Sequence, residues 1–75
     1  MTGKSTELRY FSGQKGYNND KVVFIENGTF HRGVTISSSE GKFIILRVSD
    51  SWERPENYND NLVHIDPEYI YRISR

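Results

Sequence analysis

Aromatic and basic side chains gather in the stretch DSWERPENYNDN, which begins at residue 50. The only tryptophan, Trp52, stands two residues before Arg54 and six before Tyr58. An indole ring beside a guanidinium offers a surface on which a nucleic-acid base, or a planar side chain of a partner, can stack. The same ring could instead fold back and cover one end of a small core. The sequence leaves both interpretations open.

Further basic or titratable side chains fall in two neighbouring expected strands: His31, Arg32, Lys42 and Arg47. Cross-strand neighbours of this kind can contact one phosphate group. Alternatively, they are solvated surface residues paired with Glu26 or Glu40. We predict a ligand or nucleic-acid site formed by His31, Arg32, Lys42, Arg47, Trp52, Arg54 and Tyr58.

Catalytic and metal-binding patterns are weak. Asp66 and Glu68 lie near His64, but acids that alternate at a corner are typical of solvent exposure rather than of acid–base catalysis. The serines at 37–39 lack the glycine pattern of a nucleophile elbow. The chain has no cysteine, and its two histidines are far apart, so Cys-based and His-cluster zinc sites are excluded. We expect no enzymatic activity, no cofactor and no metal site.

Length and charge limit the number of domains and the kinds of ligand that the protein can bind. A chain of 75 residues forms one domain at most, and a domain of this size buries only about 60% of its unfolded surface, so we expect oligomerisation to help stabilise it. The net charge is zero, but residues 1–49 carry seven basic and four acidic residues, whereas residues 50–68 carry six acidic residues and one basic. A polyanion must therefore bind at a local patch.

No apolar run approaches a membrane span, and the first residues lack a secretory signal, so we expect a soluble cytoplasmic protein without a membrane partner.

The periodicity of the chain predicts an all-β fold. Residues 1–20 read as a short, partly ordered N-terminal arm whose aromatics either pack over the core or stay exposed. Residues 21–75 read as one domain. KVVFIENG alternates and ends in Asn27-Gly28, a strong hairpin signal. TFHRGVTIS should bury Phe30, Val34 and Ile36 on one face, and its central Gly33 marks a bend.

The remaining strands complete the expected sheet. After a break at residues 37–41, KFIILRVSD is apolar on both faces and should form the central strand. LVHIDPEYIYRIS reads as two short strands that meet at Asp66-Pro67, because proline cannot donate to a strand ladder. We therefore predict a small, strongly bent five-stranded barrel, since closure removes exposed edges.

The order VVFIENGTFHRGVTI, GKFIILRV and VHIDPEYIYRIS resembles the Sm-like family (LSm and Hfq proteins) and also suits SH3-like barrels. Membership would imply a ring of subunits that binds RNA. It would place a subunit seam at Val63, Ile65, Tyr69, Tyr71 and Ile73. The RNA-pocket motifs are altered, because Asp66-Pro67-Glu68 stands where the family carries a basic residue, and the turn before Lys42 lacks a clean counterpart of the other motif.

Two functional hypotheses follow. The first is a non-catalytic, homo-oligomeric Sm-like barrel that binds RNA, DNA or a nucleotide-type ligand. The second is a small protein–protein interaction module, such as an inhibitor or sequestering protein of a phage or mobile element, acting through its acidic 50–68 segment. Phosphate binding should respond to salt and to Arg32→Ala or Arg47→Ala, whereas a protein partner should respond to changes at Glu53, Glu56 and Asp60.

Overall fold

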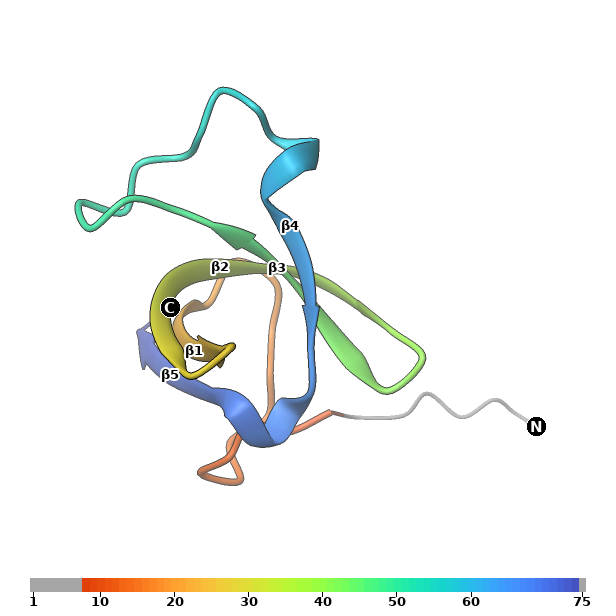
Figure 1. Cartoon of the computed structure of the whole chain (residues 1–75). Helices are drawn as coiled ribbons and strands as arrows, with labels where there is room; N and C mark the ends of the chain where they lie inside the picture. Colours follow the sequence, from red (N-terminus) through yellow and green to blue (C-terminus); the bar gives the residue numbers. More distant parts are fainter. Residues whose placement is uncertain (1–7, 75) are drawn as a thin grey trace.

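The structure, a computed structural model, describes residues 8–74 and is built from one antiparallel sheet (Figure 1). Its strands are β1 (Lys21–Glu26), β2 (Thr29–Ser39), β3 (Lys42–Arg47), β4 (Leu62–Ile65) and β5 (Ile70–Ser74). Short 3-10 turns precede the last two strands: η1 (Asn59–Asn61) and η2 (Pro67–Tyr69). The predicted all-β, strongly bent, five-stranded fold is confirmed. The barrel stays open, because β4 and β5 are the two edges in the order β4-β3-β2-β1-β5.

Two tight turns set the register of the first three strands. Asn27 and Gly28 have φ values of 53° and 77°, and Glu40 and Gly41 have 55° and 82°. Positive φ at both central residues is the geometry of the hairpin turn that Asn-Gly favours. The first turn was predicted from its sequence. The second is shorter than the predicted break, because β2 continues to Ser39.

The central strand is β2 rather than β3, since β2 is the middle strand in the order β4-β3-β2-β1-β5. The expected buried face of β2 is also wrong at its start, because Phe30 is 65% exposed. Phe30 pairs with Ile25 near the Asn-Gly turn, where the two strands run past the core. The inward positions include Gly33 and Thr35, and a register shift follows between Thr35 and Ser37.

Gly33 lets the bent sheet close over its core. A Cβ atom at this position would lie 2.4 Å from Cγ2 of Ile45 and 3.0 Å from the carbonyl oxygen of Leu46. The first contact is shorter than real Cβ atoms show and the second is tight, so a side chain at this position would force Ile45 to shift. The predicted bend at Gly33 thus has a packing cause.

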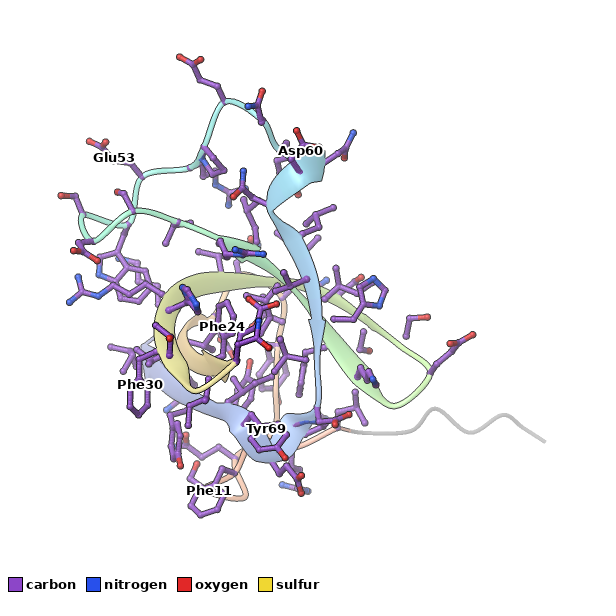
Figure 2. The ribbon with its side chains drawn as sticks, in the orientation of Figure 1. Phe11, Phe24, Phe30, Glu53, Asp60 and Tyr69 are labelled. Carbon is purple, nitrogen blue, oxygen red and sulfur yellow. The ribbon has the colours of Figure 1, made fainter. Side chains whose placement is uncertain are left out.

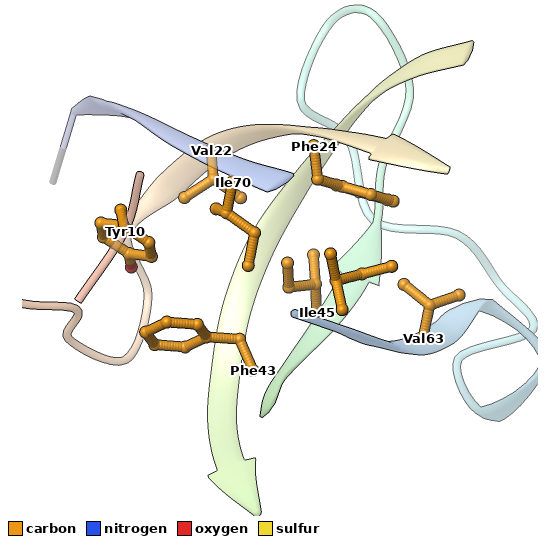
Figure 3. Close-up of a cluster of buried hydrophobic side chains, with 8 residues drawn as sticks. Tyr10, Val22, Phe24, Phe43, Ile45, Val63 and Ile70 are labelled. Atoms are coloured by element: carbon orange, nitrogen blue, oxygen red, sulfur yellow. The ribbon is translucent and has the colours of Figure 1, made fainter. Parts of the chain in front are cut away.

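The core fills the inside of the curled sheet and includes one residue from the N-terminal arm (Figure 3). It consists of Tyr10, Val22, Phe24, Phe43, Ile45, Val63, Ile65 and Ile70. The Tyr10 ring stacks on Phe43 with centroids 4.8 Å apart, and a Cβ at Gly16 would clash with the Phe43 ring. Phe11 and Tyr17 remain exposed. Of the three arm aromatics considered, Tyr10 therefore packs on the core.

Hydrogen bonds fix residues 8–20 on the barrel. The buried Tyr10 hydroxyl donates to Oδ2 of Asp20 over 2.8 Å and lies 3.1 Å from Oγ1 of Thr35. The Tyr17 amide donates to the same Asp20 oxygen, and the Phe11 amide donates to the carbonyl of Ile70. The first seven residues of the predicted arm lie outside the described part of the chain. From residue 8 onward, the arm is an integral part of the packing.

Among residues 8–74, no helix is long and apolar enough to cross a membrane. The same residues contain no group of three or more side chains able to hold a metal ion.

Candidate ligand-binding site

A tight turn at residues 49–53 positions the indole ring. The Trp52 amide donates to the carbonyl of Ser49 over 2.8 Å, and the Ser49 amide donates to the carbonyl of Glu53 over 3.1 Å. The Ser49 hydroxyl also accepts bonds from the amides of Ser51 and Glu53. Trp52 has a φ of 65°, a left-handed conformation that costs a non-glycine residue about 1–2 kcal/mol. The turn therefore holds a bulky aromatic residue where glycine or asparagine would be favoured.

The ring lies beside two cations from the outer face of β1 and β2. The register pairs Lys21 with Val34 and Val23 with Arg32, so Lys21 and Arg32 share one face. Nζ of Lys21 lies 5.5 Å from the Trp52 ring centroid, and Cζ of Arg32 lies 5.6 Å from it. Both distances fall within the range of cation–π attraction. We call Lys21, Arg32 and Trp52 the indole cluster.

Further backbone contacts hold Arg32 in place. Its Nη1 donates a hydrogen bond to the backbone oxygen of Asp50, and its own carbonyl accepts from the amide of Val48 over 3.0 Å. One bond thus holds the side chain of Arg32 and the other holds its backbone. The guanidinium is therefore ordered before any ligand arrives.

The cations of the indole cluster differ from Lys42 and Arg47 in having no acidic partner in the described chain. Nζ of Lys42 lies 3.8 Å from Oδ1 of Asp66, and Nη2 of Arg47 lies 3.6 Å from Oε1 of Glu26. The alternative interpretation, in which basic strand residues pair with acids such as Glu26, therefore holds for Arg47. Within residues 8–74, neither Lys21 nor Arg32 forms an ion pair. Their positive charges remain available to an anion.

A hollow of about 360 Å³ adjoins the indole cluster and shares Arg32 with it. Its lining residues are Val23, Phe30, His31, Arg32, Val48 and Asp50. Figure 2 shows Phe30 directed away from the sheet, and its ring is 65% exposed. His31 lies between the core and the hollow, because its ring packs 5.5 Å from that of Phe24. We call this space the β1–β2 hollow.

The structure thus joins only part of the predicted site. Arg32 and Trp52 meet, and His31 lines the adjoining hollow. Within residues 8–74, no ring or hydrogen-bond contact links Trp52 to Arg54 or Tyr58, both of which are exposed. Nor does Trp52 belong to the core cluster, although its side chain is partly buried.

Sequence reasoning missed Lys21, although the signal was present. The Asn27-Gly28 turn pairs Glu26 with Thr29, and counting back along the ladder places Lys21 and Arg32 on one face. The contact with Trp52 depends on the 49–53 turn. The left-handed position of that turn is occupied by Trp52 itself, so no glycine or asparagine indicates the turn in the sequence.

Glu53 and Asp60 of the acidic 50–68 segment lie at the opposite end of the molecule to Phe11 and Tyr69 (Figure 2), whereas Asp66 and Glu68 line a hollow together with Phe11. Glu53, Glu56 and Asp60 are exposed, and within the described chain none of them forms an ion pair. A shallow hollow of about 380 Å³ lies along residues 56–60. These three acids therefore present negative charge that no ion pair within residues 8–74 compensates, whereas Asp66 of the same segment pairs with Lys42.

The residues of the predicted seam divide by burial. Val63 and Ile65 are 9% and 7% exposed and belong to the chain's own core, so only their backbone would be open to a neighbour. Tyr69 and Ile73 are 45% and 56% exposed. Tyr71 is half-buried, with its ring 5.1 Å from that of Phe11. The seam itself remains a prediction.

Comparison with protein-family models, curated proteins and solved structures finds no match for this chain. The Sm-like resemblance therefore rests on the sequence pattern alone.

Proposed function

We propose that the protein is a non-catalytic binding module that takes a phosphate-bearing ligand, a nucleic acid or a nucleotide, at the indole cluster. The observation that carries the proposal is the placement of Lys21 and Arg32 against one indole ring without an acidic partner in the described chain. Two other basic strand residues, Lys42 and Arg47, are each paired with an acid. Two unbalanced cations held side by side form a local anion site on a molecule of zero net charge.

The strained turn adds support. Residues in unfavourable backbone conformations cost of order 1–3 kcal/mol and concentrate at binding sites, where the surrounding structure holds them. Trp52 has such a conformation, and four hydrogen bonds of Ser49 maintain its turn. A glycine at position 52 would relieve the strain but would remove the ring that orders the two cations.

Self-association belongs to the same proposal. β4 and β5 are open edges of the sheet, and an edge strand offers unpaired backbone groups to another chain. The exposed Tyr69 and Ile73 side chains lie at the β5 edge. An Sm-like assembly would pair β5 of one subunit with β4 of the next and would repeat the indole cluster around the ring.

The intrinsic fluorescence of Trp52 tests ligand binding directly, because the chain has no other tryptophan. We expect a single-stranded oligonucleotide to change the emission, with an affinity that falls steeply as salt rises. Lys21→Ala and Arg32→Ala should each weaken binding and lower the salt slope by about 1. Lys42→Ala and Arg47→Ala are matched controls, since they remove cations already paired with acids. Equal losses in all four variants would refute the indole cluster as the site.

A second function is favoured by the projecting acidic segment. Glu53, Glu56 and Asp60 carry unpaired charge into solvent, which suits docking on a basic protein surface. An inhibitor or sequestering protein would act in this way. Reversing the three charges to lysine should then abolish capture of a basic partner from a cell extract while leaving oligonucleotide binding intact. Capture that survives the triple reversal would exclude the segment as the docking site.

A further inference from the structure

We propose that the ligand of the indole cluster is a guanine nucleotide whose base occupies the β1–β2 hollow. The inference rests on the proposed function and adds the orientation and chemical class of the ligand. Arg32 is the link, because it belongs to the indole cluster and also lines the hollow. A ligand whose phosphate contacts Arg32 can therefore extend its remaining atoms into the adjoining space.

The two ends of the site differ in charge, because the Trp52 end carries cations alone whereas the hollow combines Arg32 with an acid, and this difference orients the ligand. Lys21 lies at the Trp52 end and does not line the hollow, whereas Asp50 does. Asp50 is exposed and, within residues 8–74, forms no ion pair. Asp50 brings one negative charge to the lining of the hollow, and that charge disfavours a phosphate there. The phosphate therefore lies between Lys21 and Arg32, and the hollow receives a group that donates hydrogen bonds.

The shape and lining of the hollow suit a planar base. Val23 and Val48 supply apolar surface, and Phe30 supplies an exposed ring against which a base can stack. The volume of about 360 Å³ lies at the lower end of the range of small-ligand sites, roughly 300–1,000 Å³. A hollow of this size suits a single base rather than several stacked bases.

Asp50 favours guanine among the four bases. An ionised carboxylate only accepts hydrogen bonds, and it has two oxygens. Guanine presents two adjacent donors, the ring N1–H and the exocyclic amino group, so it can donate to both oxygens at once. Adenine and cytosine place an acceptor nitrogen beside their amino donor, and uracil flanks its single donor with two carbonyls. Those acceptors would face the carboxylate and weaken binding.

Isothermal titration calorimetry tests the inference with five probes: pyrophosphate, GMP, AMP, CMP and UMP. We expect GMP to bind at least about tenfold more tightly than the other three nucleotides, the discrimination typical of one bidentate pair. Asp50→Asn should remove that preference while leaving pyrophosphate affinity unchanged or higher, because one repelling charge is lost. Phe30→Ala should weaken all nucleotides but not pyrophosphate. Glu53→Gln is the matched control for Asp50→Asn, since Glu53 carries an exposed carboxylate in the same turn without lining the hollow.

The outcomes separate the inference from the function on which it rests. If pyrophosphate binds and the four nucleotides bind with equal affinity, the guanine assignment is wrong while the phosphate site stands. If Asp50→Asn retains the preference for GMP, Asp50 does not select the base and the proposal fails. If neither pyrophosphate nor any nucleotide binds the wild-type protein, the proposed function and the inference fail together. Thermal unfolding of each variant establishes that a lost affinity is not a lost fold.

Discussion

Two clusters of the described chain each combine an aromatic ring with polar side chains, and they differ in whether those side chains are buried and hydrogen-bonded or exposed and without an acidic partner. In the first, the Tyr10 ring is 3% exposed, and its hydroxyl bonds to Asp20 and Thr35, each 1% exposed. We call these three residues the tyrosine cluster. In the indole cluster, Lys21 and Arg32 are exposed and contact the Trp52 ring without an acidic partner in the described chain.

We infer from this difference that the tyrosine cluster stabilises the fold and that the indole cluster binds a ligand. A buried, bonded cluster contributes to folding, because losing one member leaves the others unsatisfied in a dry environment. An exposed cluster whose charges are unbalanced contributes little to folding and keeps its interaction energy for a ligand. Substitutions in the tyrosine cluster should therefore change unfolding, whereas substitutions in the indole cluster should change binding.

The largest effect on stability is expected from Asp20→Ala. This change removes the acceptor of the Tyr10 hydroxyl and of the Tyr17 amide. The Tyr10 hydroxyl keeps Thr35 as a neighbour, so we expect the loss of two bonds to a charged group and one stranded amide to cost about 3 kcal/mol. Urea unfolding followed by circular dichroism measures the loss. Asp60→Ala, which truncates an exposed acid, is the control and should change stability by no more than about 0.5 kcal/mol. A similar result for the two variants would remove the tyrosine cluster from the account of stability.

An intermediate effect is expected from Tyr10→Phe and from alkaline pH. The hydroxyl contributes about 1–2 kcal/mol through its bonds to buried partners. Burial raises the pKa of Tyr10 to about 12, whereas an unfolded tyrosine has a pKa of about 10. The unfolded state therefore releases its proton first as pH rises, so this contribution is complete below pH 10 and is lost between pH 10 and about 12.

Comparing the stability of the wild type with that of Tyr10→Phe separates the titration of Tyr10 from that of other groups that lose a proton at alkaline pH. Wild-type stability should fall more steeply than that of Tyr10→Phe between pH 10 and about 12, where the pKa of Tyr10 is raised by its burial. Tyr58→Phe, which alters an exposed ring, should follow the wild type. Parallel curves for wild type and Tyr10→Phe would contradict the burial of the hydroxyl.

The smallest effect on stability is expected from Trp52→Asn. Asparagine tolerates the left-handed conformation of position 52, so relief of strain should offset the lost cation–π contacts and leave stability within about 1 kcal/mol of wild type. Oligonucleotide binding, followed by fluorescence anisotropy of a labelled strand, should fall by at least about tenfold. A destabilisation above about 2 kcal/mol with intact binding would instead identify Trp52 as a residue that covers the core.

Local patterns predicted the fold well because they follow from backbone chemistry. Asn27-Gly28 needs positive φ, and the alternation in Lys21–Glu26 places Val22 and Phe24 inward. The faces of β2 were harder to predict, because Phe30 is apolar yet lies near the hairpin turn on the same exposed face as Arg32. The site was predicted only in part, because its contacts also depend on how the chain folds. Arg32 and Trp52 were named from residue type, but only the folded turn decides that Lys21, rather than Arg54, joins them.

The most direct test of the comparison is a titration of the ¹⁵N-labelled protein with pyrophosphate, followed by NMR chemical shifts of the backbone and side-chain N–H groups. The account predicts perturbations at Lys21, at the Arg32 guanidinium and at the Trp52 indole N–H. It predicts unchanged signals at Tyr10, Asp20 and Thr35, which are buried and linked through the Tyr10 hydroxyl. An absence of any change at Arg32 and Trp52, or a response centred on the tyrosine cluster, would contradict the claim that the uncompensated cations form the binding site.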